Sequence, residues 1–391
     1  MPGSLVLMGS GETSPTMVEV HRAVARGLRA GARAVLLDTP YAFQENAADI
    51  SARARRYFAR SVGLEVEPAT GIVGADWVFS GPGSPTYALD RWAASGVAGD
   101  LRARVRSRQG VTVLASAAAC TAGLATVPVY EIYKVGADPH WREGIGLLAP
   151  LGLRAVLIPH FDNAEGGSHD TRYCYLGERR LSRMERELPP ETAVLGLDEH
   201  TALIINLESE AVEVAGRGGL TVRRPGAVTV LPAGTRTSLA VVRDLAAGAT
   251  TGTVPPPRPA PAVGPAVTLE ETIRSCERLF EDAVGRPDLV AAARLVLDLE
   301  AEIVTWAADT EEDAGGVDQA RELMRLLIAR LGEVAATAGL RALVEPLLEL
   351  RAQLRREGRY EIADALRATM ARGGVTVEDT PAGPRWSPAT V

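Results

Sequence analysis

The sequence predicts an α/β domain with a largely parallel sheet and flanking helices, followed by a C-terminal helical domain. Three observations carry this prediction: alternating apolar and helical segments, a proline-rich interruption, and helical periodicity after it. A chain of 391 residues also exceeds what one hydrophobic core usually organises. We therefore expect domains at residues 1–248 and 268–391, joined by an extended Pro-rich linker at 249–267.

The expected strands of the first domain are short apolar runs bounded by Gly, Pro or polar residues. They are residues 5–8, 34–37, 77–80, 111–115, 155–158 and 202–206. Their alternation with helical stretches is typical of βα units around a buried parallel sheet. After residue 208, the segments AVEVAG, LTVRR, AVTVLPAG and SLAVV are separated by Gly and Pro. These segments predict short antiparallel strands that extend the sheet edge.

The second domain is expected to contain four or five packed helices. Four segments have apolar residues at intervals of three and four, with charged residues between them. They are residues 269–283, 289–307, 318–336 and 340–357. Most of these charges are expected to cover solvated helix faces.

Composition restricts the class of protein. With 46% hydrophobic and 23% charged residues, the chain is typical of soluble globular proteins. The apolar run at residues 5–8 is too short for a signal peptide or a membrane span, so we expect a cytoplasmic protein without membrane contact. A net charge of −7 gives no global attraction to nucleic acid. We expect a homo-oligomer, although no sequence feature specifies its size.

The cysteines predict neither a disulfide framework nor a zinc site of the CxxC type. Cys120, Cys174 and Cys276 are odd in number and far apart, so reduced thiols are expected. No motif in the sequence requires a cofactor, and we expect none.

A candidate nucleophile lies in the segment VTVLASAAACTAG, residues 111–123. A strand there meets small residues that begin a helix, which is the context of a sharp turn that exposes a nucleophile. Ser116 lies at that turn, and the following helix N-terminus would favour developing negative charge. Tight packing between a strand and a helix explains the same small residues, so both interpretations remain open.

A base and an orienting carboxylate are expected at other strand ends. His160 follows the strand at residues 155–158, and the carboxyl ends of parallel strands meet where such sheets bind ligands. Asp198 and Glu199 lie in VLGLDEHTALII, and either carboxylate could orient the imidazole. The sequence therefore indicates a Ser-His-acid site.

Two glycine-containing segments are expected to line the same site. In WVFSGPGSPTYAL, the amides of Gly83 and Ser84 could form an oxyanion hole with that of Ala117. In LMGSGETSP, Gly9 and Gly11 are candidate substrate-binding residues, and the absence of a P-loop lysine argues against a nucleotide.

The segment after His160 allows two further interpretations. Arg172 and Arg180 could bind a substrate carboxylate through paired hydrogen bonds. Alternatively, imidazoles and carboxylates could hold zinc or manganese, although a flexible substrate loop at Gly166 and Gly167 explains the segment equally well. The candidate metal ligands are His160, Asp162, His169 and Asp170.

The N-terminal motifs resemble the cyanophycinase and dipeptidase E group of serine peptidases. Residues 114–119 (LASAAA) fit the family's G-x-S-A-G-A turn, and residues 196–203 fit its G-[IL]-D-E-x-T-A-L signature. Gly123, the pair His160-Phe161 and the pair Arg180-Leu181 also match. The resemblance implies a class I glutamine amidotransferase-like fold and hydrolysis of a small peptide or amide by Ser116.

The same resemblance leaves an inactive relative possible. Leu114 and Ala118 replace both glycines of the family's turn, and a shifted alignment would put Ala118 in the nucleophile's position. In that case the chain would hold a ligand without turnover. Cyanophycin-like peptides, acidic dipeptides and an aminoacyl conjugate all remain candidate substrates.

The C-terminal stretch is similar to the C-terminal end of cysteinyl-tRNA synthetases. The motif A-D-x-[IL]-R matches residues 363–367, and G-[IV]-x-[VL]-E-D-T-P-x-G-x-x-W matches residues 374–386. The resemblance implies that tRNA could be a partner, through phosphate contacts and stacking. The candidate contacts are Arg351, Arg355, Arg356, Arg359, Arg367, Arg372 and Trp386. No HIGH-like or KMSKS-like motif accompanies them, and a helical scaffold for protein contacts is the competing interpretation.

Overall fold

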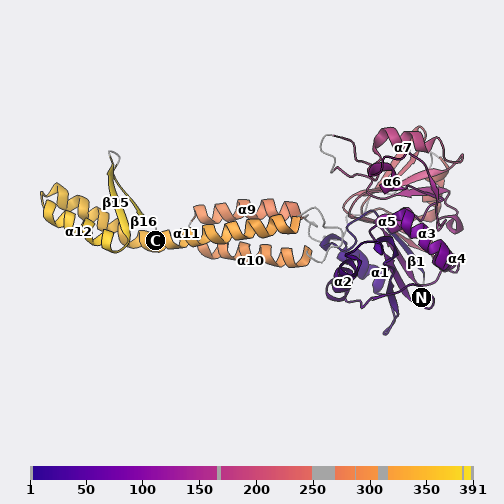
Figure 1. The fold of residues 1–391 in the computed structure, drawn as a ribbon, viewed down its shortest axis with the longest axis horizontal. Helices are drawn as coiled ribbons and strands as arrows, with labels where there is room; N and C mark the ends of the chain where they lie inside the picture. The colour runs from indigo at the N-terminus through magenta and orange to yellow at the C-terminus, as the bar shows by residue number, and fades with distance from the viewer. Residues whose placement is uncertain are drawn as a thin grey trace. The chain divides into compact units, whose positions relative to one another are not determined.

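The computed structural model describes residues 3–164, 169–248, 269–286, 288–306, 316–380 and 383–388. The expected linker at 249–267 and the Gly166-Gly167 pair lie outside these residues. The described residues form two compact units, the first α/β and the second mainly helical (Figure 1).

The main sheet of the first unit has eight strands in the order β14-β11-β10-β1-β5-β4-β2-β3. Their bounds are β14 (Arg236–Ser238), β11 (Ala211–Gly216), β10 (Thr201–Asn206), β1 (Ser4–Met8), β5 (Val111–Ala115), β4 (Trp77–Ser80), β2 (Ala34–Leu36) and β3 (Glu67–Pro68). The neighbouring strands β1, β5, β4, β2 and β3 are parallel to one another. The other three strands, β10, β11 and β14, pair in antiparallel fashion, and β10 is also antiparallel to β1. This arrangement confirms the predicted fold class.

Helices cover the main sheet on both faces, which explains the unbroken apolar runs of its central strands. Leu5 and Leu7 of β1 belong to a core that includes Trp92 of α3, whereas Val6 and Met8 belong to the core shared with α1 and α2. The bounds are η1 (Pro15–Met17), α1 (Val18–Ala25), η2 (Thr39–Tyr41), α2 (Ala47–Tyr57), η3 (Phe58–Val62), α3 (Pro85–Ser95), α4 (Val97–Arg106) and α5 (Ser116–Cys120).

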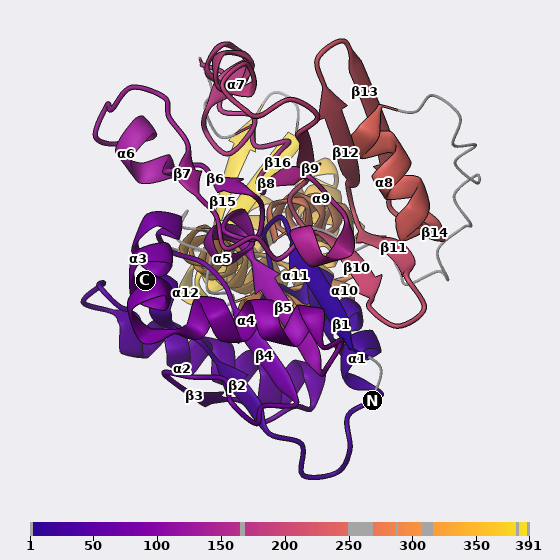
Figure 2. The ribbon, with the colours of Figure 1, turned by 90° about the vertical axis from the view of Figure 1, so that its right-hand side faces the viewer.

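A second, four-stranded sheet completes the first unit, in the order β13-β12-β9-β8 (Figure 2). Only β8 and β9 are parallel in it. The strands are β8 (Ala155–Ile158), β9 (Ala193–Leu197), β12 (Gly219–Arg224) and β13 (Ala227–Pro232). The remaining elements are β6 (Ala125–Thr126), α6 (Val129–Tyr133), β7 (Arg142–Glu143), η4 (Ala149–Leu151), α7 (Gly177–Glu185) and α8 (Leu239–Ala247). The expected single sheet is therefore two sheets, and 155–158 lies in the smaller one.

The segment SLAVV begins helix α8, so its expected strand is wrong. Ser238 caps this helix, since its Oγ accepts a hydrogen bond from the Val241 amide at 3.5 Å. Leu239, Val242 and Ala246 are buried at helical spacing. An N-cap serine and this periodicity outweigh the β-propensity of the two valines.

The second unit consists of helices and a C-terminal hairpin. Its elements are α9 (Leu269–Gly285), α10 (Leu289–Trp306), α11 (Gly316–Arg356), α12 (Tyr360–Arg372), β15 (Val375–Thr380) and β16 (Gly383–Pro388). The expected helices at 318–336 and 340–357 are one helix, α11, which continues through Gly339 and Pro346. Strong helix formers on both sides of Gly339 carry the helix past it. The hairpin was not expected from the sequence pattern.

No helix in the described ranges is both long and apolar enough to cross a membrane.

Candidate active site

Ser116 lies at the junction of β5 and α5, in a left-handed backbone conformation with φ of +47°. Residues other than glycine rarely adopt this conformation, and such strain concentrates at functional sites. The Ala118 amide donates to the Gly81 carbonyl at 3.2 Å, and a Cβ on Gly123 would lie 2.7 Å from the backbone of β8. Ser116 as a whole is 8% exposed. The small residues therefore allow close packing at the same place where the chain turns sharply.

His160 and Glu199 lie in a continuous set of hydrogen bonds with this serine. His160 follows the end of β8, and its Nε2 lies 2.9 Å from Ser116 Oγ. Its Nδ1 lies 2.8 Å from Glu199 Oε1, in the loop between β9 and β10. Asn163 donates to the same Glu199 oxygen at 3.2 Å. The structure thus brings the predicted serine and imidazole together with one of the two predicted carboxylates.

Glu199 is held by backbone and side-chain contacts. Its amide donates to Asp162 Oδ1 at 2.7 Å. Burial alone would raise the pKa of Glu199, but the hydrogen bond and charge of His160, with the Asn163 amide, outweigh burial and lower it. An ionised carboxylate at this position can stabilise a protonated imidazole.

Asp198 has a different role from its neighbour. Its Oδ2 accepts a hydrogen bond of 2.7 Å from the backbone amide of Gly219, the first residue of β12. Burial, and then the charge of Asp162, raise the pKa of Asp198 to about 6. No described hydrogen bond joins Asp198 to His160, so Glu199 is the residue that contacts the imidazole.

The three predicted oxyanion donors differ in how their amides are used. The Ser84 amide donates to the Pro40 carbonyl at 2.8 Å, and its Oγ accepts from the Tyr87 amide at 3.2 Å, which caps α3. Ser84 therefore serves the fold, and we remove it from the candidate donors. Gly83 has φ of +126°. Ala117 lies in the first turn of α5, where amides have no acceptor within the helix.

Gly9 and Gly11 pack against the loop that carries Glu199. A Cβ on Gly9 would overlap the backbone of Asp198, and one on Gly11 would overlap the ring of His200. This close packing explains why both positions are glycine. The expected substrate contact of Gly9 and Gly11 stays a prediction. His200 Nδ1 lies 2.8 Å from Thr16 Oγ1, and this residue pair was missed because no sequence signal joins positions so far apart.

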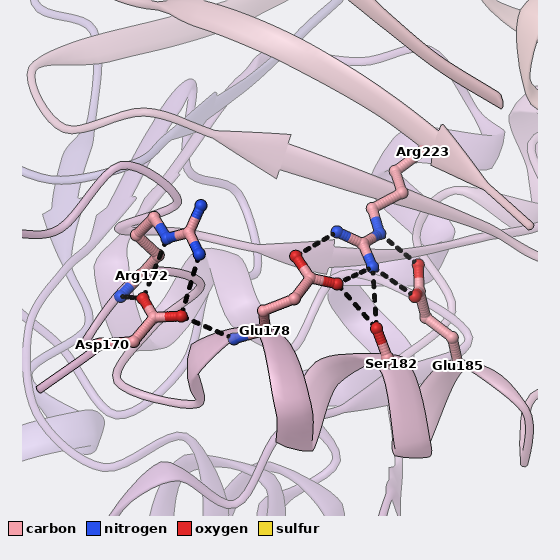
Figure 3. A network of polar contacts seen from close by, with 6 residues as sticks. All are labelled: Asp170, Arg172, Glu178, Ser182, Glu185 and Arg223. Carbon is pink, nitrogen blue, oxygen red and sulfur yellow. Dashed lines mark hydrogen bonds and ion pairs between the residues drawn. The ribbon is translucent and has the colours of Figure 1, made fainter. Parts of the chain in front are cut away.

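The predicted carboxylate-binding arginines have partners within the protein. The Arg172 guanidinium makes two hydrogen bonds of 2.9 Å to Asp170, which also accepts the backbone amides of Arg172 at 3.2 Å and of Glu178 at the start of α7 (Figure 3). The hydrogen bond to Arg172 is the main cause that lowers the pKa of Asp170. Arg180 donates to the Leu176 carbonyl at 3.3 Å. A substrate carboxylate would therefore have to compete with Asp170 for the Arg172 guanidinium, and the expected role of Arg172 stays a prediction.

The alternative metal ligands point to separate partners. His160 and Asp162 serve Ser116 and Glu199 as described, whereas His169 lies 3.5 Å from the Tyr133 hydroxyl and Asp170 binds Arg172. Within the described ranges, no three His, Cys, Asp or Glu side chains are grouped so that they could hold a metal ion.

In the second unit, the predicted RNA contacts divide into buried and exposed residues. The Arg351 side chain is 2% exposed and makes hydrogen bonds of 2.7 and 2.8 Å to Asp379 of β15. Arg351 therefore holds the hairpin to α11 and is not an RNA contact. Trp386 is half-buried against the core of Val344 and Leu348. The exposed candidates are Arg355, Arg356, Arg359, Arg367 and Arg372.

No protein-family model matches the chain. The chain is 32% identical over 146 residues to a cysteine–tRNA ligase of Frankia casuarinae, covering 34% of this chain and 27% of that protein. It is 46% identical over 43 residues to the cysteine–tRNA ligase of Carboxydothermus hydrogenoformans, which covers 11% of this chain and 9% of that protein. The chain thus spans about a quarter of the first relative's length and a smaller share of the second. The similarity to cysteinyl-tRNA synthetases that the C-terminal motifs predicted is therefore confirmed for part of the chain.

Solved peptidase structures are among the structural neighbours. A peptidase from an acI-B1 Actinobacterium is 18% identical, with a TM-score of 0.45, over 61% of this chain and 97% of that one. A candidate peptidase E protein from Listeria monocytogenes is 12% identical, with a TM-score of 0.37, over 59% of this chain and 99% of that one.

Proposed function

We propose that the first unit is a serine hydrolase of peptide or amide bonds. The observation that supports this proposal is the continuous set of hydrogen bonds from Ser116 Oγ through His160 to Glu199, at 2.9 and 2.8 Å. A nucleophile, a base within hydrogen-bond distance and a third group that orients the base are the geometric requirements of such a site.

In the proposed reaction, Ser116 Oγ attacks the substrate carbonyl carbon while its proton moves to His160 Nε2. The amides of Gly83 and Ala117 are the candidate donors to the resulting oxyanion. The intermediate collapses, the leaving amine takes the proton from His160, and an ester remains on Ser116. A water then transfers a proton to His160 and attacks the ester. The ester bond breaks, His160 returns the proton to Ser116 Oγ, and the acid is released.

The proposal predicts that a fluorophosphonate labels the full-length protein at one serine. We expect intact-mass analysis to show one adduct, peptide mapping to place it on Ser116, and Ser116→Ala to abolish it. The reason is that only an activated serine reacts quickly with such a reagent. A folded protein that does not react would favour the alternative, a crevice that holds a ligand without turnover.

A second candidate function is RNA binding by the second unit, which the likeness to cysteine–tRNA ligases favours. Arg356 and Arg372 are exposed near its C-terminal end. We predict that the full-length protein retains tRNA at low salt and that Arg356→Glu with Arg372→Glu weakens retention at least about tenfold. The matched control is Arg321→Glu, an exposed residue near the start of α11. No retention at low salt would exclude this function.

A further inference from the structure

Aromatic rings form a row beside the imidazole of the proposed site. The ring centroid of Tyr175 lies 6.4 Å from that of His160, and Tyr133 lies 4.9 Å from Tyr175. His169 stacks on Tyr133 at 6.4 Å. We call Tyr175, Tyr133 and His169 the aromatic row. Because His160 contacts Ser116 directly, the row begins one ring away from the proposed nucleophile.

An unusual turn places Tyr175 in this row. Tyr173, Cys174 and Tyr175 all have left-handed backbones, with φ of 62°, 55° and 65°. Three such residues in succession are unfavourable and persist only where other contacts hold them. The Cys174 amide donates to the His160 carbonyl at 3.0 Å, and the Tyr173 amide donates to the Phe161 carbonyl at 3.0 Å. The turn is therefore bonded to the same backbone that carries His160.

Ion pairs hold the turn on both sides (Figure 3). Asp170 joins Arg172 to the start of α7, and Arg223 of β12 binds Glu178 of α7, with one hydrogen bond of 3.0 Å. The buried Tyr173 ring lies 5.0 Å from the Arg172 guanidinium and 5.5 Å from that of Arg223. The half-buried Tyr175 is thus presented from a rigid support, as a preorganised binding surface requires.

The charges near the site oppose an acidic substrate. Asp162 and Glu199 lie next to His160, and the guanidinium of Arg172 is already bound to Asp170. Aromatic faces instead favour apolar and aromatic groups. Given the proposed hydrolase, we propose that the aromatic row binds the side chain on the acyl side of the cleaved bond and selects aromatic or large aliphatic residues over acidic ones.

The test uses diphenyl α-aminophosphonates on the full-length protein, with side chains corresponding to Phe, Leu, Gly, Asp and Arg. Ser116 Oγ attacks phosphorus and a phenoxide leaves as phenol, so the rate constant of adduct formation reports side-chain preference. We expect the Phe or Leu reagent to react at least about tenfold faster than the Gly and Asp reagents. A faster Asp or Arg reagent would overturn the inference.

Variants locate the preference. Tyr175→Ala should lower the ratio of the Phe to the Gly rate constant by about tenfold, while Tyr175→Phe should keep it because the ring remains. Tyr133→Ala should lower the ratio in the same direction and carries the test if Tyr175→Ala does not fold. The matched control, Tyr360→Ala in the second unit, should leave it unchanged. An unchanged ratio in both Tyr175→Ala and Tyr133→Ala would also refute the proposal that the aromatic row selects the substrate side chain.

The two proposals fail in different ways. If the small fluorophosphonate does not label Ser116, the hydrolase proposal fails and the aromatic row loses its substrate. If it labels Ser116 but the Phe and Leu reagents show no advantage, only the specificity inference is wrong.

Discussion

Replacing Glu199 by glutamine should slow the labelling of Ser116 by a fluorophosphonate about 10²- to 10⁴-fold near neutral pH. The carboxylate lies 2.8 Å from His160 Nδ1, where its charge would stabilise the imidazolium that forms as the serine loses its proton. Glutamine removes the charge and can donate its amide to Nδ1, which would favour the wrong imidazole tautomer. The measurement is the second-order rate constant of adduct formation by intact-mass analysis.

Asp198→Asn is the matched control, because it changes the adjacent carboxylate. Asparagine can still accept the Gly219 amide, so this variant should change the rate only a few-fold. A similar loss in both variants would mean that Glu199 is not the orienting residue. Burial raises the pKa of Glu199, but the hydrogen bond and charge of His160, with the Asn163 amide, together lower it below its usual value. Protonation of Glu199 should therefore not limit the rate at mildly acidic pH.

The sequence pattern locates the strand ends of the candidate site well. The apolar runs that include β5 and β8 end next to Ser116 and His160, because a buried parallel strand needs apolar residues throughout and its connecting loop does not. These signals are local. The choice between Asp198 and Glu199 is not local, since it depends on which carboxylate faces β12 and which faces His160.

Other features depend on contacts between distant residues. The Gly11 position is fixed by His200, which lies far away in the sequence. Helical periodicity identified both halves of α11, but the pattern did not show that the helix continues through Gly339. The burial of Arg351 requires a hairpin that the pattern did not indicate.

Asp379→Asn should destabilise the second unit more than Arg351→Met does, because Arg351 and Asp379 form an ion pair in which only the arginine is buried. The carboxylate is 45% exposed, whereas the Arg351 side chain is 2% exposed. Asparagine would leave a buried guanidinium without its counter-charge, at a cost of about 2–3 kcal/mol to local stability. Arg351→Met removes the buried charge and leaves a carboxylate that water can solvate, so it should cost less. Amide hydrogen exchange in β15 of the full-length protein measures both effects.

Asp318→Asn is the matched control, because its ion pair with Arg321 is exposed and should contribute almost nothing. The pKa of Asp379 is lowered by its hydrogen bond to Arg351, so its stabilisation is present above the unfolded carboxyl pKa of about 4 and is lost as pH falls through the lower, folded value. Acid should therefore speed β15 exchange, relative to its intrinsic rate, in the wild type more than in Asp379→Asn. Equal exchange in Asp379→Asn and Asp318→Asn would show that the buried pair does not hold the hairpin.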